Sequence, residues 1–386
     1  MKPNADADFS FVRKHEKVRM YQNKMDRIWF TCGGWHQIEP VTVNKVGTFF
    51  RHAVHPVKTE PIRVIVEVKL IASARKMVTV RSALQIISKI SMPIEILCQA
   101  IRCNPDSLDS EDGTPIDGRI IGRLEPNSTF FVDISETNSE LRIRPCDGYT
   151  FYSTESIKWW TSHKTQCQIL NCSGQPSENS VAYHASKSFF TRLERSDFPS
   201  GLELKSEIDE LERRASEQRI GPSKKTESIN LNMAMPGHNC YIYPAITIKN
   251  LLPLDLGYWL VGQDGIISSH QSKEIFYHPN VINLRLKLEG FNTSEDIPLP
   301  RDRQETTTAI ITDLNGRSTL LTVKLQVDPC IVISISAKYW LVNHTSLPLV
   351  FRQKECETAA GQFEDHEEAR CRMPLLFAYT EFEEWV

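Results

Sequence analysis

A strand–turn–strand unit with a polar turn residue followed by a proline constrains the fold of this chain most strongly. In residues 331–353, IVISISAKYWLVNHTSLPLVFRQ, apolar and polar side chains alternate up to a turn that contains Asn343 and Pro348, after which a second apolar stretch begins. Alternation with period two is typical of a strand with one buried face, while Asn and Pro favour turns. The segment therefore predicts two strands joined by a turn.

Similar units occur twice earlier in the chain. Residues 83–97, ALQIISKISMPIEIL, carry Ser88 and Pro93 at the same spacing. Residues 245–260, AITIKNLLPLDLGYWL, carry Asn250 and Pro253, with a turn that is two residues shorter. Recurrence of one supersecondary unit predicts a tandem array of related β modules.

Period-two alternation outside these units supports an all-β fold. It is seen from Val64 to Leu70, with the valines on the expected buried face, and again at residues 282–288 and 321–327. The Asn315–Gly316 pair between two apolar stretches predicts a hairpin with a two-residue type I′ turn, because both central positions of that turn need positive φ.

One segment has a helical period instead. Leu204, Ile208 and Leu211 recur at i, i+4 and i+7 among charged residues, which predicts a short amphipathic helix inserted into a β module. We thus expect an all-β chain of tandem β-sandwich modules with a short helical insertion. The expected divisions are the C-terminal part of a truncated module at 1–82, a module at 83–240 with the helix at about 201–221, a module at 241–330, and the start of another truncated module at 331–386.

Composition narrows the function classes. The chain of 386 residues has 45 Lys plus Arg against 48 Asp plus Glu, and the resulting net charge of -3 argues against a nucleic-acid binder. No apolar run is long enough for a membrane span, and the N-terminus lacks an apolar signal core, so a cytosolic chain is expected. Ten scattered cysteines without a CxxC pair predict reduced, individually buried thiols.

No constellation for catalysis or cofactor binding stands out, so the sequence predicts a protein that is not an enzyme. GxSxG, HExxH, P-loop and dinucleotide fingerprints are all missing from the sequence. His36, His52 and His55 lack a cysteine or carboxylate at a zinc-like spacing, and we predict no metal site there. The aromatic-dense segment 148–160 is expected to pack a core or a module junction.

The repeated units resemble the vacuolar protein sorting thirteen family of bridge-like lipid transfer proteins. The residues that carry the resemblance are YWLVNHTSLPLVFRQ, AAGQFEDHEEARCRMPLLFAY, VEVKLIASARKMVTVRSALQIISKISMPIEI and ITIKNLLPLDLGYWL, which occur in the family's order from about residue 60 onward. The segment after Phe351 is most similar to the D-type paralogue. The resemblance identifies the chain as a fragment of the family's adaptor-binding region, a row of β-sandwich repeats.

In that family each repeat has a characteristic Asn, and the region recruits a very large protein to organelles. The resemblance therefore implies partner-binding roles for Asn250 and Asn343, toward organelle adaptors with short proline-containing motifs, whereas Ser88 departs from the pattern. The lipid conduit of the family lies outside this chain. An Asn at a strand end can also cap a turn with no partner, so the structural role stays open.

A second hypothesis is direct binding to an anionic membrane surface or lipid. Arg13, Lys14, Lys17, Arg19, Lys24 and Arg27 form a basic N-terminal stretch. Each basic residue close to anionic lipid contributes roughly 1 kcal/mol, an attraction that fades with salt. The leading expectation remains a non-enzymatic recruitment module that acts at contact sites of the endoplasmic reticulum, mitochondria, or endosomes and lysosomes.

Overall fold

The computed structural model describes residues 27–31, 34–54, 56, 62–71, 75–100, 118–133, 136, 139–148, 150–159, 165–174, 186–199, 234–260, 263–277, 282–352, 359–362, 370 and 374–378. Nearly all of them lie in strands and the turns between strands, which confirms the predicted all-β fold. The helix expected at about 201–221 lies outside the described residues. No helix in the described ranges is long and apolar enough to cross a membrane.

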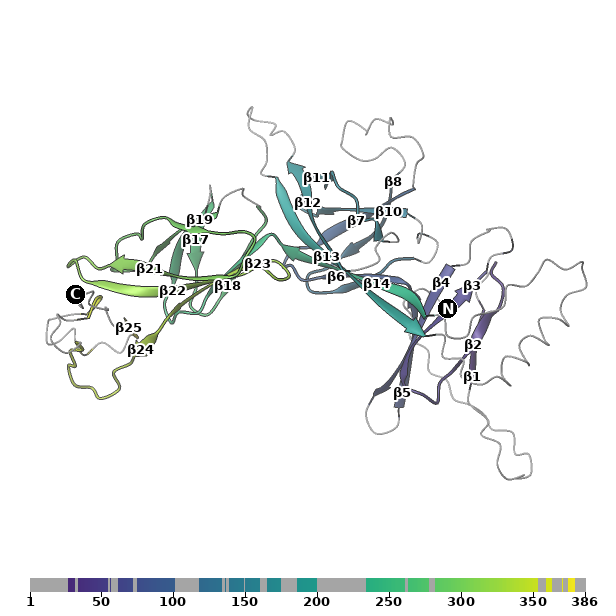
Figure 1. Ribbon diagram of the computed structural model, residues 1–386, viewed down its shortest axis with the longest axis horizontal. Helices are drawn as coiled ribbons and strands as arrows, with labels where there is room; N and C mark the ends of the chain where they lie inside the picture. Colours follow the sequence, from purple (N-terminus) through teal and green to yellow (C-terminus); the bar gives the residue numbers. More distant parts are fainter. Residues whose placement is uncertain are drawn as a thin grey trace, which may run out of the picture.

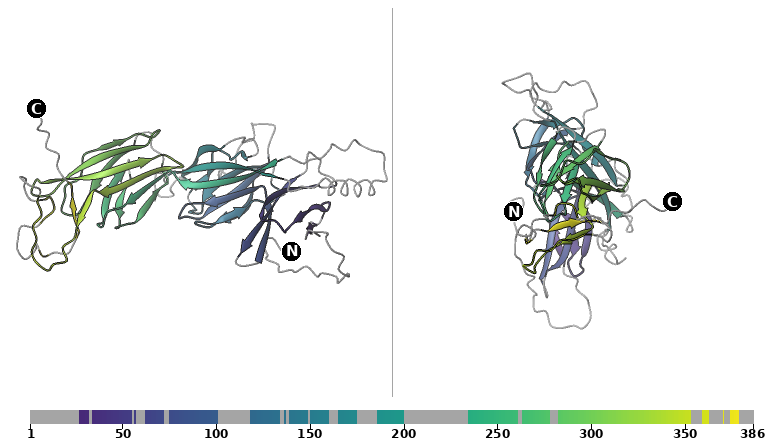
Figure 2. Two further views of the ribbon diagram at one scale, coloured as in Figure 1. Left: turned by 60° about the horizontal axis from the view of Figure 1, so that its bottom comes forward. Right: turned by 90° about the vertical axis from the view of Figure 1, so that its left-hand side faces the viewer.

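The strands form three lobes that follow one another along the long axis of the molecule (Figures 1 and 2). Lobe 1 consists of the two-stranded sheet β1–β2 and the three-stranded sheet β3–β4–β5. Its own small core includes Ile38, Val41 and Val66. The strands of lobe 1 are β1 (Arg27–Phe30), β2 (Ile38–Thr42), β3 (Gly47–Ala53), β4 (Ile62–Ile71) and β5 (Arg75–Ser82).

Lobe 2 packs a six-stranded sheet, in the order β11–β12–β13–β14–β6–β9, against the three-stranded sheet β10–β7–β8. Inward-facing residues of both sheets, such as Ile86, Ile96 and Leu141, are fully buried between them. The strands are β6 (Leu84–Ser88), β7 (Ile94–Ala100), β8 (Gly118–Leu124), β9 (Thr129–Phe131), β10 (Ser139–Pro145), β11 (Thr150–Ser153), β12 (Gln166–Gly174), β13 (Lys187–Pro199) and β14 (Ala234–Pro244).

Lobe 3 repeats this arrangement with a five-stranded sheet, β18–β15–β23–β22–β21, and a four-stranded sheet, β17–β16–β19–β20. An antiparallel hairpin of β24 (Tyr339–Leu341) and β25 (Leu375–Phe377), with a long connection between the two strands, follows it. The second strand predicted after Pro348 is not formed, because the N–H and carbonyl groups of Phe351 bond the Gln362 side chain instead of a neighbouring strand. The strands of lobe 3 are β15 (Ile246–Asn250), β16 (Leu256–Leu260), β17 (Gln263–Ile267), β18 (Ser272–Ile275), β19 (Ile282–Lys287), β20 (Ile297–Leu299), β21 (Glu305–Thr312), β22 (Ser318–Gln326) and β23 (Ile331–Ala337).

Lobes 2 and 3 are closed by the same pairing of their first and last strands. In lobe 2, β6 pairs in parallel with β14, and in lobe 3, β15 pairs in parallel with β23. Single residues join the lobes. Ala83 joins β5 of lobe 1 to β6, Ala245 joins β14 to β15, and Lys338 joins β23 to β24. These pairings favour divisions at the three connecting residues, whereas the four-module division at 82/83, 240/241 and 330/331 stays a prediction.

The alternating segments at 282–288 and 321–327 form β19 and β22, each with one buried face, as predicted. The segment Val64–Leu70 departs from its prediction at two positions. Ile65, which was expected on the polar face, is fully buried because it packs into the core of lobe 2, and Leu70, which was expected inside, is 57% exposed. Contact with lobe 2 thus overrides the simple alternation at Ile65.

The hairpin predicted at Asn315–Gly316 is present, but its turn is not type I′. Thr312 pairs with Ser318, and within the intervening loop the Asp313 N–H bonds the Arg317 carbonyl at 2.8 Å. Gly316 has positive φ and Asn315 does not, so the loop is a three-residue connection with glycine at its left-handed position. The prediction missed that Asp313 supplies the turn with its own side-chain acceptor.

Candidate functional site

Asn250, at the end of β15, has a completely buried side chain that lies where the two sheets of lobe 3 meet. Its Nδ2 lies within hydrogen-bond distance of three carbonyl oxygens, those of Leu254 at 2.8 Å, Ile267 at 3.0 Å and Ser268 at 3.2 Å. Its Oδ1 accepts a hydrogen bond from the Leu252 N–H at 3.0 Å. The side chain therefore ties β15 to the end of β17.

Asn343 follows β24 and has a similar but smaller set of bonds. Its Nδ2 donates to the Leu347 carbonyl at 2.7 Å, and its Oδ1 accepts from the Thr345 N–H at 3.0 Å and from the Thr345 hydroxyl at 2.8 Å. Its side chain is mostly buried. The side-chain amides of both predicted site residues thus bond the turn that follows each of them, and that of Asn250 also bonds the end of β17.

Ser88 occupies the corresponding place in lobe 2. Its hydroxyl accepts from the backbone N–H two residues on, at 3.4 Å, as Oδ1 of Asn250 does in lobe 3. Asn127 and His270, both with positive φ, each donate their N–H to the carbonyl of that same residue, two beyond Ser88 or Asn250. Ser88 keeps the acceptor and lacks the amide donor. Ser88 and Asn250 therefore correspond in their hydrogen bonds as well as in their place in the sequence unit.

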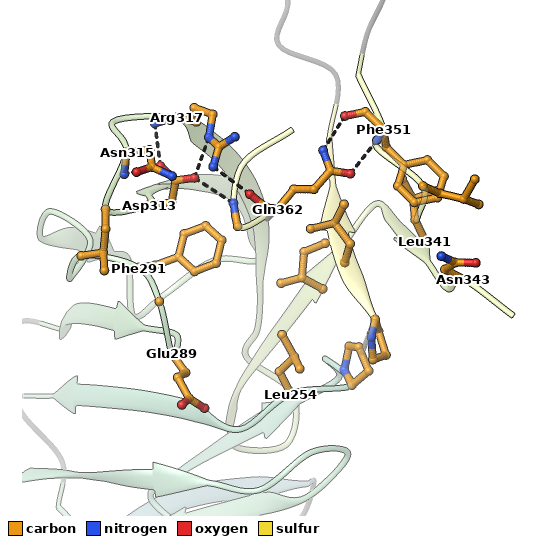
Figure 3. Close-up of a pocket in the computed structure, with 18 of the residues that line it drawn as sticks. Leu254, Glu289, Phe291, Asp313, Asn315, Arg317, Leu341, Asn343, Phe351 and Gln362 are labelled. Atoms are coloured by element: carbon orange, nitrogen blue, oxygen red, sulfur yellow. Dashed lines mark hydrogen bonds and ion pairs between the residues drawn. The ribbon is translucent and has the colours of Figure 1, made fainter. Parts of the chain in front are cut away.

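A groove of about 810 Å³ separates lobe 3 from the β24–β25 hairpin (Figure 3). This volume lies in the range of small-ligand pockets, about 300–1,000 Å³, and it would hold a few residues of an extended peptide. Lobe 3 contributes the turn after β15, the loop after β19 and the tip of the β21–β22 hairpin. The lining residues are Pro253, Leu254, Asp255, Glu289, Gly290, Phe291, Asp313, Leu314, Asn315, Arg317, Leu341, Asn343, Leu349, Phe351, Gly361, Gln362, Pro374, Leu375 and Leu376.

Asp313 and Arg317, at the tip of the β21–β22 hairpin of lobe 3, bind Gly361 and Gln362, which form the far wall of the groove (Figure 3). Asp313 Oδ1 accepts from the backbone N–H groups of Asn315 and Arg317, and its Oδ2 accepts from the Arg317 guanidinium and the Gly361 N–H, all at 2.8–2.9 Å. Arg317 Nη2 donates to the Gln362 carbonyl at 2.9 Å. Burial would raise the pKa of Asp313, but the hydrogen bonds from Gly361 and Arg317, together with the positive charge of Arg317, hold it below its ordinary value.

Gln362 and Gly361 complete that wall. The Gln362 side chain donates to the Phe351 carbonyl at 2.8 Å and accepts from the Phe351 N–H at 2.5 Å. Gly361 has positive φ, and a Cβ there would lie 2.6 Å from the Phe291 ring, so only glycine allows the ring to approach this closely. The groove is therefore preformed within the chain.

The structure separates the two predicted site residues. Asn343 lines the groove, whereas Asn250 lies behind the turn at residues 253–255 that forms part of the opposite wall. Sequence reasoning missed Phe291, Asp313, Arg317 and Gln362, which come from loops distant along the chain. A signal was present only for Asp313, whose position before Asn315–Gly316 is typical of a side chain that caps a turn.

Of the histidines and basic residues singled out in the sequence, those that the structure describes do not line the groove. His52 in lobe 1 has its pKa lowered by burial and by Arg63, against the opposing effect of Glu39. His55 and the basic residues 13–24 lie outside the described part. Within the ranges that the structure describes, no three His, Cys, Asp or Glu side chains are grouped so that they could hold a metal ion.

The cysteines only partly follow their prediction. All six that the structure describes are free thiols, and Cys98, Cys172, Cys240 and Cys330 are buried. Burial raises the pKa of Cys240 to about 12. Cys167, expected to be buried, is instead exposed because its end of β12 faces solvent. In the aromatic segment, Tyr152 and Trp159 are buried in lobe 2, which confirms the packing role.

The family model described as vacuolar-sorting associated protein 13, adaptor binding domain, matches residues 9–385. This chain belongs to the VPS13 family. The D-type resemblance is confirmed by human intermembrane lipid transfer protein VPS13D, which is 30% identical over 397 aligned positions covering 94% of this chain and 8% of that protein.

A second similar protein is intermembrane lipid transfer protein Vps13D of Drosophila melanogaster, which is 27% identical over 402 aligned positions covering 99% of this chain and 9% of that protein. The chain thus spans less than a tenth of the length of these curated relatives. The VPS13 family model that it matches describes a domain of lipid transfer proteins rather than an enzyme class.

Proposed function

We propose that this chain is a non-enzymatic recruitment module that binds extended segments of adaptor proteins in the groove between lobe 3 and β24–β25. The observation that carries the proposal is an open groove with apolar walls at a junction between repeats, in a chain that belongs to an adaptor-binding domain. Leu254, Leu341, Leu349 and Leu375 offer apolar surface to a partner's side chains. Burial of such surface is the main source of affinity.

The proposal extends to proline-containing motifs. Phe291 and Phe351 lie on opposite sides of the groove, as Figure 3 shows. Proline-rich segments dock in aromatic-lined grooves, and their preformed extended conformation keeps the entropy cost of binding low. In this proposal Asn250 and Asn343 contribute to partner binding by holding the two turns that form the walls. Their amides are already bonded within the chain, so they act as positioning residues.

The wider role follows from the length of the relatives. We propose that adaptor binding recruits a larger lipid transfer protein to organelle contact sites, with the endoplasmic reticulum, mitochondria, and endosomes or lysosomes as the candidate membranes. Lipid would travel in a conduit elsewhere in that protein, and this region would make peripheral contact with the membrane. The near-neutral charge balance continues to argue against a nucleic-acid partner.

Titration of the full chain with a panel of fluorescent proline-containing peptides tests the proposal. Leu349 lines the groove and Leu347, on the same loop, does not, so the two leucines form a matched pair. We expect Leu349→Gln to weaken binding about tenfold or more, since it places a polar group on an apolar contact, and Leu347→Gln to leave binding unchanged. Equal effects of the two substitutions would overturn the assignment of the groove.

Direct binding to an anionic membrane surface is the second candidate, because of the basic residues between Arg13 and Arg27. Co-sedimentation with phosphatidylserine vesicles at low salt, lost at high salt, would support it. Absence of co-sedimentation at low salt would remove it.

A further inference from the structure

The ionisable side chains that line the groove carry an excess of negative charge. Among the residues that the structure describes, they are three carboxylates, Asp255, Glu289 and Asp313, and one guanidinium, Arg317. Asp313 and Arg317 neutralise each other at 2.9 Å and are nearly enclosed, and their remaining polar atoms bond the backbone. That leaves two carboxylates to face a ligand.

Asp255 and Glu289 are both exposed at the groove. Asp255 accepts one hydrogen bond, from the Ser269 N–H at 3.0 Å, and Figure 3 places Glu289 on the same side of the groove as Leu254. Among the described side chains, neither carboxylate has a Lys, Arg or His within ion-pair distance. Both charges are therefore free to attract a cation on a partner.

Building on the proposed function, we infer that the groove selects adaptor segments in which a Lys or Arg accompanies the apolar side chains. The apolar walls hold the hydrophobic residues, and the two carboxylates attract the basic residue and repel acidic ones. The same charge repels the phosphate of an anionic lipid, so the occupant is a basic–apolar peptide rather than a lipid headgroup. Charge complementarity of this kind acts mainly on specificity and association rate.

Selection of a random peptide display library on the full chain tests this, because such a library favours no particular adaptor. We expect the bound peptides to be enriched in Lys and Arg relative to the starting library. Selection on the double variant Asp255→Asn/Glu289→Gln should lose that enrichment and keep the enrichment of apolar residues. Asp302→Asn/Glu295→Gln removes the same charge from exposed positions outside the groove lining and serves as the control.

The contribution of the two carboxylates to affinity is then measured with one selected peptide, whose basic residue is kept or changed to Gln or Glu. We expect about fivefold weaker binding to the groove variant for the Lys peptide, a loss that high salt reduces, and little change for the Gln peptide. An unchanged thermal midpoint of the variant shows that folding is intact, because both replaced groups are exposed.

The outcomes separate the inference from the function on which it rests. Enriched peptides without basic residues, or a Lys preference that survives in the groove variant, would overturn the inference and leave adaptor binding standing. Failure to enrich any peptide would overturn the adaptor function itself. Binding of phosphatidylserine vesicles that competes with a selected peptide for the groove would overturn the peptide as its occupant.

Discussion

The carboxylate of Asp313 and the guanidinium of Arg317 form an ion pair with only 4% and 8% of their side chains exposed, at the seam between lobe 3 and the chain that follows it. The pair closes the turn of one hairpin, and through Gly361 and Gln362 it also holds the far wall of the groove. One buried ion pair thus couples the stability of a turn to the shape of the candidate site.

Asp313→Asn should be strongly destabilising because it leaves the Arg317 charge buried without its partner. We expect a loss of about 3 kcal/mol in the free energy of unfolding of lobe 3, measured by urea denaturation. The exposed pair Arg285–Asp296 supplies the control, because we expect Asp296→Asn, which breaks an exposed ion pair, to cost far less. Equal effects would show that Asp313 is not enclosed in solution.

The pH dependence of stability should reveal the same carboxylate. The pKa of Asp313 is held below its ordinary value of 3.8, so its contribution is present above that value and is lost as the pH falls through the lower, folded value. The stability difference between wild type and Asp313→Asn should therefore be constant well above pH 3.8 and should shrink as the pH is lowered through 3.8 toward the folded-state pKa. Urea midpoints of both proteins above and below pH 3.8 check it, and a difference that stays constant through pH 3.8 would contradict it.

Asn250→Ser tests the positioning role, because serine is the residue that lobe 2 carries at this place. Serine can keep the acceptor for the Leu252 N–H and loses the donor to the carbonyls around it. We expect a loss of about 1–3 kcal/mol in the free energy of unfolding, seen as a lower unfolding midpoint. Peptide binding should weaken only as far as the folded fraction falls. Asn283→Ser, at an exposed position of β19, is the control. Full stability with lost binding would instead make Asn250 a contact residue.

Phe276→Ala should uncouple lobes 2 and 3. The Phe276 ring packs against Phe189 of lobe 2 with centroids 5.4 Å apart, and its carbonyl accepts a hydrogen bond from Ser188. Removal of the half-buried ring should cost about 2 kcal/mol, and calorimetry should show one transition becoming two. Tyr277→Ala removes an exposed neighbouring ring and should leave a single transition. Two transitions in the wild type would contradict this coupling.

Local patterning predicted the strands with clear alternation of apolar and polar residues, such as β15, β19 and β22, because a half-buried strand shows its buried face in its own sequence. It failed at Ile65, whose burial depends on a neighbouring lobe, and at the Asn315–Gly316 turn, where the Asp313 carboxylate selects a longer loop. It also failed after Pro348, where the expected strand is replaced by a segment that bonds the Gln362 side chain. The groove was beyond reach, since Phe291, Asp313 and Gln362 meet only once two sheets and a following hairpin are in place. The sequence could indicate the turn residues, but the groove forms only when lobe 3 and the hairpin that follows it pack together.

The parallel pairing of first and last strands also determines how these lobes respond to tension. The chain enters lobe 3 at the amino end of β15 and leaves it at the carboxyl end of β23, and these ends lie at opposite ends of a ladder that runs from Ile246–Ile331 to Asn250–Ile335. A pull on the two ends of the lobe therefore shears the whole ladder at once instead of peeling one bond at a time. The connections at Ala245 and Lys338 are single residues, so they can extend very little under force. A force applied along the chain would therefore pass from one lobe to the next through the parallel ladders.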